Sequence, residues 1–353
     1  MASPLLSMDR VTARQHGRAV LDAVSLRLGR GQTLALLGPA GAGKTAILLA
    51  LAGFLRLTSG SIRLADRDIT ATAPETRDIA MAFDTDALFP HLPVLDNVAF
   101  GLKMRGVPRA ARRAQALAAL QVLGIGGLAG KPPARLDPAE RRLVALARAA
   151  VTHPALLLVD EPAASDASAN REDARAVLRA ALGPDHTTAI LATHDRAAAF
   201  ALAERVALLR NGRLEQQGTP QDLFDRPATR FAAMFTGACN LLPAILLHER
   251  DGAAVVNVAG VTAAACCPPG MAAGPVTLCI RPHRVRAEAE GKLRGVVERA
   301  DFQGALTHVT LGTQAGQCLV ETAQPPPGLA PGVALGLDWD GTDAWAIPPE
   351  AAS

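Results

Sequence analysis

The chain of 353 residues contains no tyrosine, and aromatic residues make up only 3% of it. Charge of one sign is not concentrated either: 36 Lys and Arg stand against 33 Asp and Glu, for a net charge of +3. Proteins that bind nucleic acid usually combine a basic face with aromatic stacking residues. We therefore expect no nucleic-acid partner.

Long apolar runs are missing as well. No stretch reaches the roughly 20 apolar residues that a membrane span needs. Residues 1–10 lack a basic start followed by a sustained apolar core, so we expect no signal peptide. A chain of this kind would work at a membrane through a partner.

Cysteine is scarce and unevenly placed. No C-x-x-C pair or histidine at zinc spacing accompanies the five cysteines, which speaks against a metal site. We expect reduced, mostly buried thiols of a cytosolic protein. All five lie in the last third of the chain, at Cys239, Cys266, Cys267, Cys279 and Cys318.

One stretch fits G-x-x-x-x-G-K-[ST] at every fixed position. The apolar run 33–37 before it predicts a buried strand, and residues 46–52 after it predict a helix. This order of strand, glycine loop and helix disfavours the simpler interpretation, a glycine turn that happens to precede a helix. The stretch consists of Gly38, Pro39, Ala40, Gly41, Ala42, Gly43, Lys44 and Thr45.

Such a loop suits a polyphosphate. Its successive backbone N–H groups and the positive end of the following helix attract anions. Lys44 can reach the outer phosphates, and the Thr45 hydroxyl can hold Mg²⁺. The sequence therefore predicts nucleotide binding.

Two further apolar runs end in polar side chains. Residues 155–159 predict a strand that ends at Asp160 and Glu161, and residues 188–193 predict one that ends at His194. In parallel α/β sheets the carboxyl ends of the strands face the ligand. Asp160 then suits Mg²⁺ coordination, Glu161 suits a water beside the terminal phosphate, and His194 is a candidate contact to that phosphate.

The remaining patterns outline two domains. Residues 6–28 predict antiparallel strands, 60–69 a strand pair, 78–83 a buried strand, and 96–124 a helical segment. From about residue 243, short alternating strands separated by Pro and Gly turns predict a small all-β, barrel-like domain. The fold class is thus α/β, with a helical insertion at about 85–152. We place the domains at 1–240 and 241–353.

Taken together, the order of motifs resembles the ATPase subunits of ABC transporters, in the bacterial importer branch with a C-terminal TOBE-type domain. Gly38 to Thr45 corresponds to Walker A, residues 156–160 to Walker B, Glu161 to the catalytic glutamate and His194 to the switch histidine. Residues 86–102 resemble the segment that docks the membrane subunits, and 144–149 the helix after the signature motif. The hairpin at 210–220 is similar to the one that closes the domain.

The family's signature L-S-G-G-Q is altered here. Leu136 is kept, but Asp137 brings a negative charge toward phosphate and Pro138 removes an N–H donor. The same residues form a good helix start, with Asp137 as N-cap, Pro138 at the first position and Glu140 three residues after the cap. We expect the helix to remain and its anion-binding tip to be lost. The altered residues are Asp137, Pro138, Ala139 and Glu140.

Three other sites depart from the family pattern. The Q-loop glutamine falls on Asp84, a shorter side chain that can still bind Mg²⁺. In the D-loop, residues 164–167 read Ala-Ser-Asp-Ala, so the aspartate is one position early. The aromatic residue that stacks on adenine falls near Gln15, with His16 beside it as a substitute.

The resemblance implies an importer ATPase with ATP and Mg²⁺ as cofactors. It implies catalytic roles for Glu161, His194 and Lys44. Nucleotide binding falls to Gly38 to Thr45 with Asp84 and Asp160, and Mg²⁺ ligation to Thr45, Asp160 and Asp84. The expected location is the cytoplasmic face of the bacterial inner membrane.

The implied partners are two membrane-spanning permease subunits, a periplasmic solute-binding protein acting indirectly, and a second ATPase subunit. That second subunit is an identical chain or one with an intact signature. Residues 231–243 are similar to importers for polyamines, ferric iron and 2-aminoethylphosphonate. Two alternatives stay open, a pseudo-ATPase that binds Mg-ATP as a regulatory subunit and, disfavoured by the docking-like segment, a soluble cassette ATPase acting on DNA or ribosomes.

Overall fold

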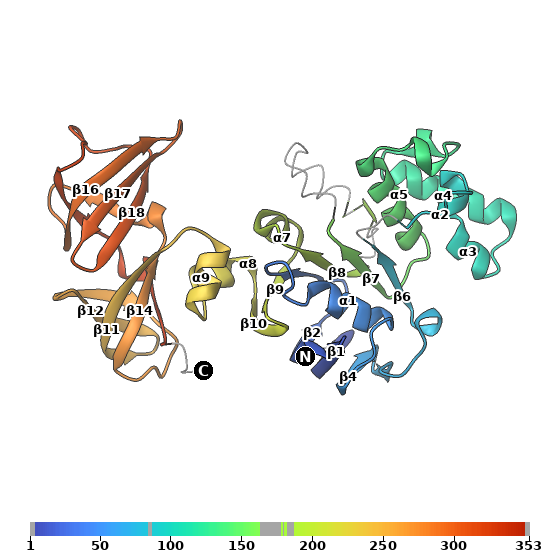
Figure 1. Cartoon of the computed structure of the whole chain (residues 1–353), viewed down its shortest axis with the longest axis horizontal. Coiled ribbons are helices and arrows are strands. Elements are labelled where there is room, and N and C mark those ends of the chain that lie inside the picture. The colour runs from blue at the N-terminus through green and yellow to red at the C-terminus, as the bar shows by residue number, and fades with distance from the viewer. Residues whose placement is uncertain (1–3, 84–86, 163–177, 179, 182–186, 350–353) are drawn as a thin grey trace. The chain divides into compact units, whose positions relative to one another are not determined.

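The computed structural model describes residues 4–83, 87–162, 178, 180–181 and 187–349 (Figure 1). By its internal contacts the chain divides into two compact units, Met1–Pro220 and Gln221–Ser353. From the sequence we place the domain boundary between residues 240 and 241, and this boundary stays a prediction. It assigns two short helices, α8 (Pro220–Asp225) and α9 (Arg230–Thr236), to the first domain, whereas their contacts place almost all of both in the second unit.

The larger sheet of the first unit has the strand order β10-β9-β3-β8-β7-β6, in which β10 and β9 are antiparallel and the other neighbours are parallel. Every residue of β3, β7 and β8 is buried, as is typical of parallel strands covered on both faces. The strands are β3 (Thr33–Leu37), β6 (Ile79–Ala82), β7 (Leu156–Asp160), β8 (Thr188–Thr193), β9 (Arg205–Arg210) and β10 (Arg213–Gly218).

Two cores cover the two faces of this sheet. In β7, Leu156 and Leu158 pack into the core shared with α1 (Lys44–Ala52), whereas Leu157 and Val159 pack into the core shared with the inserted helices. Successive side chains of a strand point to opposite faces, so one apolar run serves both cores. The helix α7 (Arg196–Leu202) follows β8 directly.

An antiparallel sheet completes the first unit, in the order β2-β1-β4-β5. Its strands are β1 (Leu6–Gln15), β2 (Arg18–Leu28), β4 (Ser59–Leu64) and β5 (Arg67–Asp68), which confirms both the antiparallel pair and the strand pair expected from the sequence. Apolar residues of this sheet, such as Leu21 and Leu26, share the core of α1.

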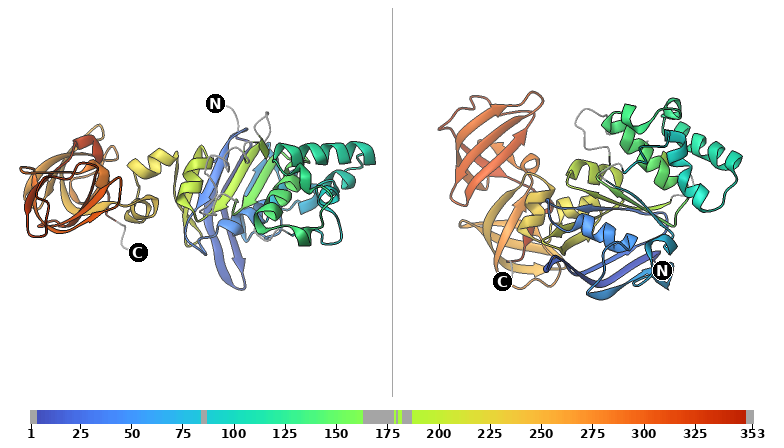
Figure 2. Two further views of the ribbon diagram at one scale, coloured as in Figure 1. Left: turned by 90° about the horizontal axis from the view of Figure 1, so that it is seen from above. Right: turned by 45° about the vertical axis from the view of Figure 1, so that its right-hand side comes forward.

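The inserted region is helical, but the segment 96–124 is not one helix. It contains α2 (Val94–Val98), α3 (Phe100–Met104) and α4 (Arg109–Val122), and α5 (Pro138–Ala150) follows. The break before α4 falls at Gly106, whose φ is 77°, and at Pro108, the cap of α4, which has no N–H to give to a preceding turn. In both views of Figure 2 these helices gather on one side of the first unit.

The helix α1 is held at its carboxyl end by a buried cation. Arg77 is 7% exposed and donates hydrogen bonds to the carbonyls of Ala50 at 2.8 Å and Leu51 at 2.7 Å. These carbonyls belong to the last turn of the helix, where backbone donors are few, and Ala50 accepts one further bond, from the Gly53 N–H at 3.3 Å. The positive charge also lies at the negative end of the helix dipole. Arg77 therefore anchors the helix that carries the glycine loop.

We expect Arg77→Met to lower the free energy of unfolding by about 3 kcal/mol, because it removes the buried hydrogen bonds to the Ala50 and Leu51 carbonyls. Urea denaturation measures this. The control is Arg63→Met, which removes an exposed arginine that bonds the Asp66 carbonyl, and it should change stability by less than about 0.5 kcal/mol. Equal effects of the two substitutions would contradict an anchoring role for Arg77.

The second unit is built from strands and contains a barrel, as expected, together with a second sheet. Five strands close a barrel in the order β11-β12-β13-β20-β14, and five others form a sheet in the order β15-β19-β16-β17-β18. The barrel strands are β11 (Asn240–Arg250), β12 (Ala253–Val258), β13 (Val261–Cys266), β14 (Gly274–Ile280) and β20 (Ala344–Ile347). The others are β15 (Arg286–Glu288), β16 (Leu293–Phe302), β17 (Thr307–Thr313), β18 (Gly316–Thr322) and β19 (Ala334–Asp338).

A single arginine ties the short helices of this unit to the barrel. Arg281, which follows β14, is 2% exposed and lies over the Phe224 ring at 4.0 Å from its centroid. Its guanidinium donates to the carbonyls of Phe224 at 2.6 Å and Ala233 at 2.9 Å, and to the Thr236 hydroxyl at 3.0 Å. Those three groups come from α8 and α9, so one side chain fixes both helices.

The five thiols are free, and three of them are buried, as the sequence predicts. Their surroundings differ. A hydrogen bond with Cys279, aided by the positive charges of Arg281 and Arg230, lowers the pKa of Cys239 to about 7. Burial raises the pKa of Cys318 to about 12.

Because the thiolate is the reactive form, we expect iodoacetamide to label Cys239 at a rate that rises with pH through about 7 and then levels off. Raising the pH through this pKa deprotonates the thiol. Cys318 should stay unlabelled in the folded chain over the same range. Peptide mass spectrometry after timed labelling provides the measurement, and Cys239→Ser is the control. Labelling of Cys239 that begins only above about pH 8.5 would contradict this pKa.

Candidate functional site

The glycine loop lies between the carboxyl end of β3 and the start of α1, as predicted. Gly43 caps the helix with a φ of 102°, a conformation that favours glycine. Lys44 is the first residue of α1 and is 9% exposed. Its Nζ donates to the loop's own carbonyls, at 2.8 Å to Gly38 and 3.0 Å to Pro39. The ammonium is thus held beneath the loop whose N–H groups the sequence assigns to phosphate.

Two positions of the loop require glycine because other backbone segments pass too close for a side chain. A Cβ at Gly43 would lie 2.9 Å from the Val20 carbonyl oxygen, and one at Gly38 would collide with the carbonyl of Leu209. Gly212 also touches the loop, since its N–H donates to the Ala42 carbonyl at 3.0 Å. The turn between β9 and β10 therefore supports the loop. The hairpin motif was visible in the sequence, but this contact was not.

The three polar groups predicted at strand ends lie at one edge of the sheet. Asp160 ends β7, and its Oδ1 accepts a hydrogen bond from the Thr45 hydroxyl at 3.3 Å. Glu161 follows with a φ of 49°, an uncommon value for a residue other than glycine. Its Oε1 is 2.9 Å from Nδ1 of His194. Glu161 is shielded at 23% side-chain exposure, whereas His194 is open to solvent at 66%.

Burial lowers the pKa of the Lys44 ammonium, and the negative charges of Glu161 and Asp160 partly oppose that effect. The Lys44 ammonium therefore interacts electrostatically with both carboxylates. A hydroxyl beside a carboxylate, as in Thr45 and Asp160, is an oxygen donor pair of the kind that Mg²⁺ prefers. These residues fit a magnesium ion at the mouth of the loop.

The start of α5 has the geometry that the altered signature predicts. Asp137 caps the helix: its Oδ1 accepts from the Glu140 N–H at 2.7 Å, and Glu140 Oε2 accepts from the Asp137 N–H at 3.0 Å. Pro138 occupies the first helical position. The N–H groups of Asp137 and Glu140 are therefore bonded to carboxylates. The expected helix and its Asp137 cap are confirmed, and the loss of anion binding at its tip stays a prediction.

The segment that resembles a docking site is organised by a buried amide. Asn97 in α2 is fully buried, accepts from the Phe89 N–H at 2.8 Å and donates to the Leu92 carbonyl at 2.8 Å. The Phe89 ring lies 4.5 Å from that of Phe100 and beneath the Arg148 guanidinium. These contacts fix the loop before α2. From the sequence, this segment could be recognised only by its resemblance to the family.

Two of the three further departures from the family pattern fall outside the described residues. Asp84 and the D-loop residues 164–167 lie outside the described residues. His16, the suggested substitute for an adenine-stacking aromatic residue, is exposed in the two-residue turn between β1 and β2, with a φ of 50°. The roles assigned to all of these residues stay predictions.

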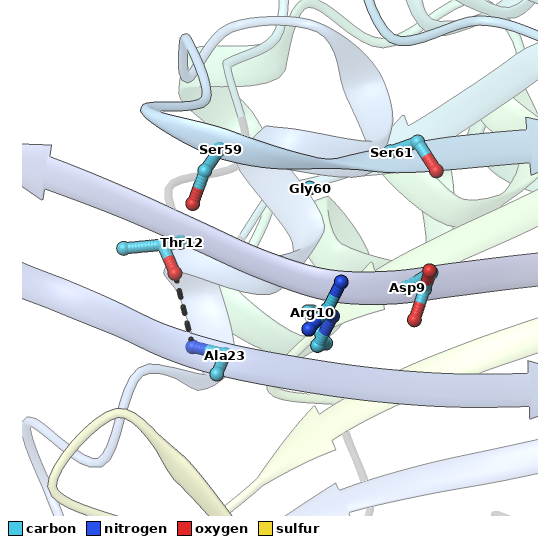
Figure 3. Close-up of a pocket in the computed structure, with 7 residues that line it drawn as sticks. All are labelled: Asp9, Arg10, Thr12, Ala23, Ser59, Gly60 and Ser61. Atoms are coloured by element: carbon cyan, nitrogen blue, oxygen red, sulfur yellow. Dashed lines mark hydrogen bonds between the residues drawn. The ribbon is translucent and has the colours of Figure 1, made fainter.

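A separate hollow of about 300 Å³ lies on the antiparallel sheet (Figure 3). It opens where β1 shifts register against its neighbours, and Thr12 there accepts a hydrogen bond from the Ala23 N–H at 3.1 Å. None of the predicted site residues lines it. Its lining consists of Asp9, Arg10, Thr12, Ala23, Ser59, Gly60 and Ser61.

Comparison with known proteins agrees with this geometry. The ABC transporter family profile matches residues 21–164, and the TOBE domain profile matches residues 278–347. In the described part of the chain, no helix combines the length and the apolar character that crossing a membrane requires.

Curated relatives match along most of their length. The Fe(3+) ions import ATP-binding protein of Streptomyces avermitilis is 38% identical over 340 residues, which cover 94% of this chain and 96% of that protein. The sulfate/thiosulfate import ATP-binding protein of Chromobacterium violaceum is 37% identical, with 98% and 96% covered. The spermidine/putrescine import ATP-binding protein of Thermobifida fusca is 33% identical, with 88% and 84% covered.

Among solved structures, cbiO1 of Clostridium perfringens, part of an ABC transporter complex, matches with a TM-score of 0.55 at 25% identity, covering 64% of this chain and 92% of that one. A dimeric ATP-binding cassette bound to ADP and Pi has the same fold, with a TM-score of 0.54 at 23% identity, covering 61% and 98%. One family assignment accounts for the phosphate loop, the carboxylates at the end of β7, the TOBE match and these relatives. The chain belongs to the ABC transporter family, as an importer-type ATPase subunit with a TOBE domain.

Proposed function

We propose that this chain binds Mg-ATP at the glycine loop and hydrolyses it to energise solute import across the inner membrane. The observation that carries the proposal is the convergence of Lys44, Asp160, Glu161 and His194 at one edge of the sheet. Lys44 follows the loop after β3, Asp160 and Glu161 lie at the end of β7, and His194 follows β8, so the parallel strands bring them together. Phosphoryl transfer depends on this kind of positioning and charge stabilisation.

The loop and its lysine serve binding. In the proposal, the backbone N–H groups of Gly38 to Thr45 hold the phosphates, and Lys44 exchanges its bonds to the Gly38 and Pro39 carbonyls for the outer phosphates. Thr45 and Asp160 would hold Mg²⁺, and Asp84 is a further proposed ligand. When bound, the ion supplies positive charge that offsets the charge of the phosphates.

Glu161 and His194 serve the attack by water. The Glu161 carboxylate stands where it can orient a water and accept its proton. His194 contacts Oε1 of Glu161 and has two-thirds of its side chain exposed, so its other ring nitrogen is available to the terminal phosphate. In the proposal, Glu161 thus holds the water and His194 holds the terminal phosphate that the water attacks.

The proposed assembly has two membrane-spanning permease subunits, a second ATPase subunit and, indirectly, a periplasmic solute-binding protein, at the cytoplasmic face of the membrane. In this family the solute is contacted by the other subunits. The relatives are named for Fe(3+), for spermidine and putrescine, and for sulfate and thiosulfate, so we propose no particular solute.

The start of α5 affects which second ATPase subunit would suit this chain. In this family the signature of one subunit meets the ATP held by the other. Here Asp137 and Glu140 direct carboxylates at the helix start and bond its N–H groups. Two identical chains would give two weakened composite sites and slow turnover, whereas a partner with an intact signature would restore one. The same observation favours a second candidate function, a subunit that binds Mg-ATP without turnover.

We expect Glu161→Gln to lower the ATP hydrolysis rate by about 10²-fold or more and to leave Mg-ATP binding within a factor of about two, because the amide cannot take a proton from water. Steady-state and single-turnover assays on the purified chain measure the rates. Glu75→Gln, at an exposed carboxylate before β6, serves as the control. Hydrolysis that survives the Glu161 substitution would refute the catalytic role.

Restoring the signature tests the alternative. A chain with Asp137→Ser, Pro138→Gly, Ala139→Gly and Glu140→Gln should hydrolyse ATP about tenfold faster than the native chain, since it regains N–H donors for phosphate. We expect a small loss of stability, about 1 kcal/mol, because two glycines replace Pro138 and Ala139 in the first turn, whereas Ser and Gln can still form a reciprocal cap. A native chain that binds Mg-ATP but shows no Glu161-dependent hydrolysis, with activity only after restoration, would establish the non-hydrolysing subunit instead.

A further inference from the structure

The Glu161 carboxylate has a second partner that the motifs do not identify. Its Oε2 accepts a hydrogen bond from the hydroxyl of Thr193 at 3.1 Å, while Oε1 faces His194. Thr193 is the last residue of β8 and is 1% exposed. Each carboxylate oxygen is thus held by one of two consecutive residues. We propose that Thr193 is a positioning residue that sets the direction of Glu161 for attack by water, an inference that rests on the proposed function.

The proton of the Thr193 hydroxyl has a defined direction. The backbone N–H of Asp195 donates to the same hydroxyl oxygen at 3.1 Å. A hydroxyl has one proton to give, and an N–H can act only as a donor. Glu161 Oε2 is the acceptor within reach, so the proton points toward it. Thr193 therefore joins the carboxylate to the start of α7.

Further hydrogen bonds hold that junction. Asp195 caps α7, with its Oδ1 accepting from the Ala197 N–H at 2.7 Å. The backbone of Glu161 is fixed to the same strand, because its N–H donates to the Ala192 carbonyl at 2.8 Å. The left-handed φ of Glu161 requires such support. Strand β8 consequently holds Glu161 by its backbone and by one carboxylate oxygen.

The hydrogen bonds of Thr193 and His194 to Glu161 differ in their exposure to water. His194 is two-thirds exposed, so water competes for its bond to Glu161, whereas the bond from Thr193 is shielded. In a shielded position a hydrogen bond to a charged group is stronger than a bond between neutral groups. If His194 turns toward phosphate, the Thr193 bond keeps the carboxylate in place. Positioning of this kind affects the chemical step more than substrate binding.

We expect Thr193→Val to lower the single-turnover hydrolysis rate about tenfold at saturating protein, with Mg-ATP affinity within a factor of about two. Thr193→Ser keeps the hydroxyl and should stay within about threefold of the native rate. The matched control is Thr188→Val, at the other end of β8. Thr188 is 3% exposed and accepts from the Gly31 N–H at 2.9 Å, so this variant also loses a buried hydroxyl that accepts a backbone bond.

The outcomes separate this role from the proposed function. Thermal melts should show comparable losses for the two valine variants, and only Thr193→Val should lose rate. Glu161→Gln is run alongside: if it abolishes hydrolysis while Thr193→Val keeps the native rate, or if Thr193→Ser falls as far as Thr193→Val, the positioning role is overturned and the function stands. If neither the native nor the signature-restored chain shows Glu161-dependent hydrolysis, the proposed function fails and the role with it.

Discussion

The parallel pairing of β7 with β8 is the constraint on which the candidate site depends. Its register sets Asp160 opposite Ala192, so that Glu161 and the pair Thr193 and His194 leave the sheet side by side. β8 also pairs with β3, which brings the glycine loop to the same edge. A slip of one residue in either ladder would reverse the faces of the side chains and separate these groups.

At the start of α5, local stability and the family's anion-binding role oppose each other. The cap that Asp137 and Glu140 form satisfies the first N–H groups of the helix within the chain. In the family's signature, the serine and the glycine N–H groups at this helix start contact phosphate, and here Pro138 and Ala139 occupy the glycine positions. The helix α5 therefore keeps its fold with a start that differs from the family's signature.

Much of this organisation could be predicted from the sequence because it follows from periodicity and from motifs with fixed spacing. The strands before Gly38, Asp160 and His194 are short apolar runs, and they end where expected. The role of Thr193 could not be predicted, since a threonine ending a strand is ordinary and its bond to Glu161 spans 32 residues of chain. The same holds for Gly212, whose partner is a backbone carbonyl, and for Arg281, most of whose hydrogen bonds go to backbone carbonyls, because no sequence pattern marks these groups.

The closure of the β-barrel in the second unit bears on how the chain is made. β20 completes the barrel by pairing with β14 on one side and with β13 at Trp345 on the other. All strands of the neighbouring sheet are synthesised between β14 and β20. On the ribosome, the nascent barrel therefore keeps two open strand edges until residues 344–347 emerge. Unpaired edges recruit other strands, so a chain that ended before this point would leave its barrel strands open to pairing with other chains.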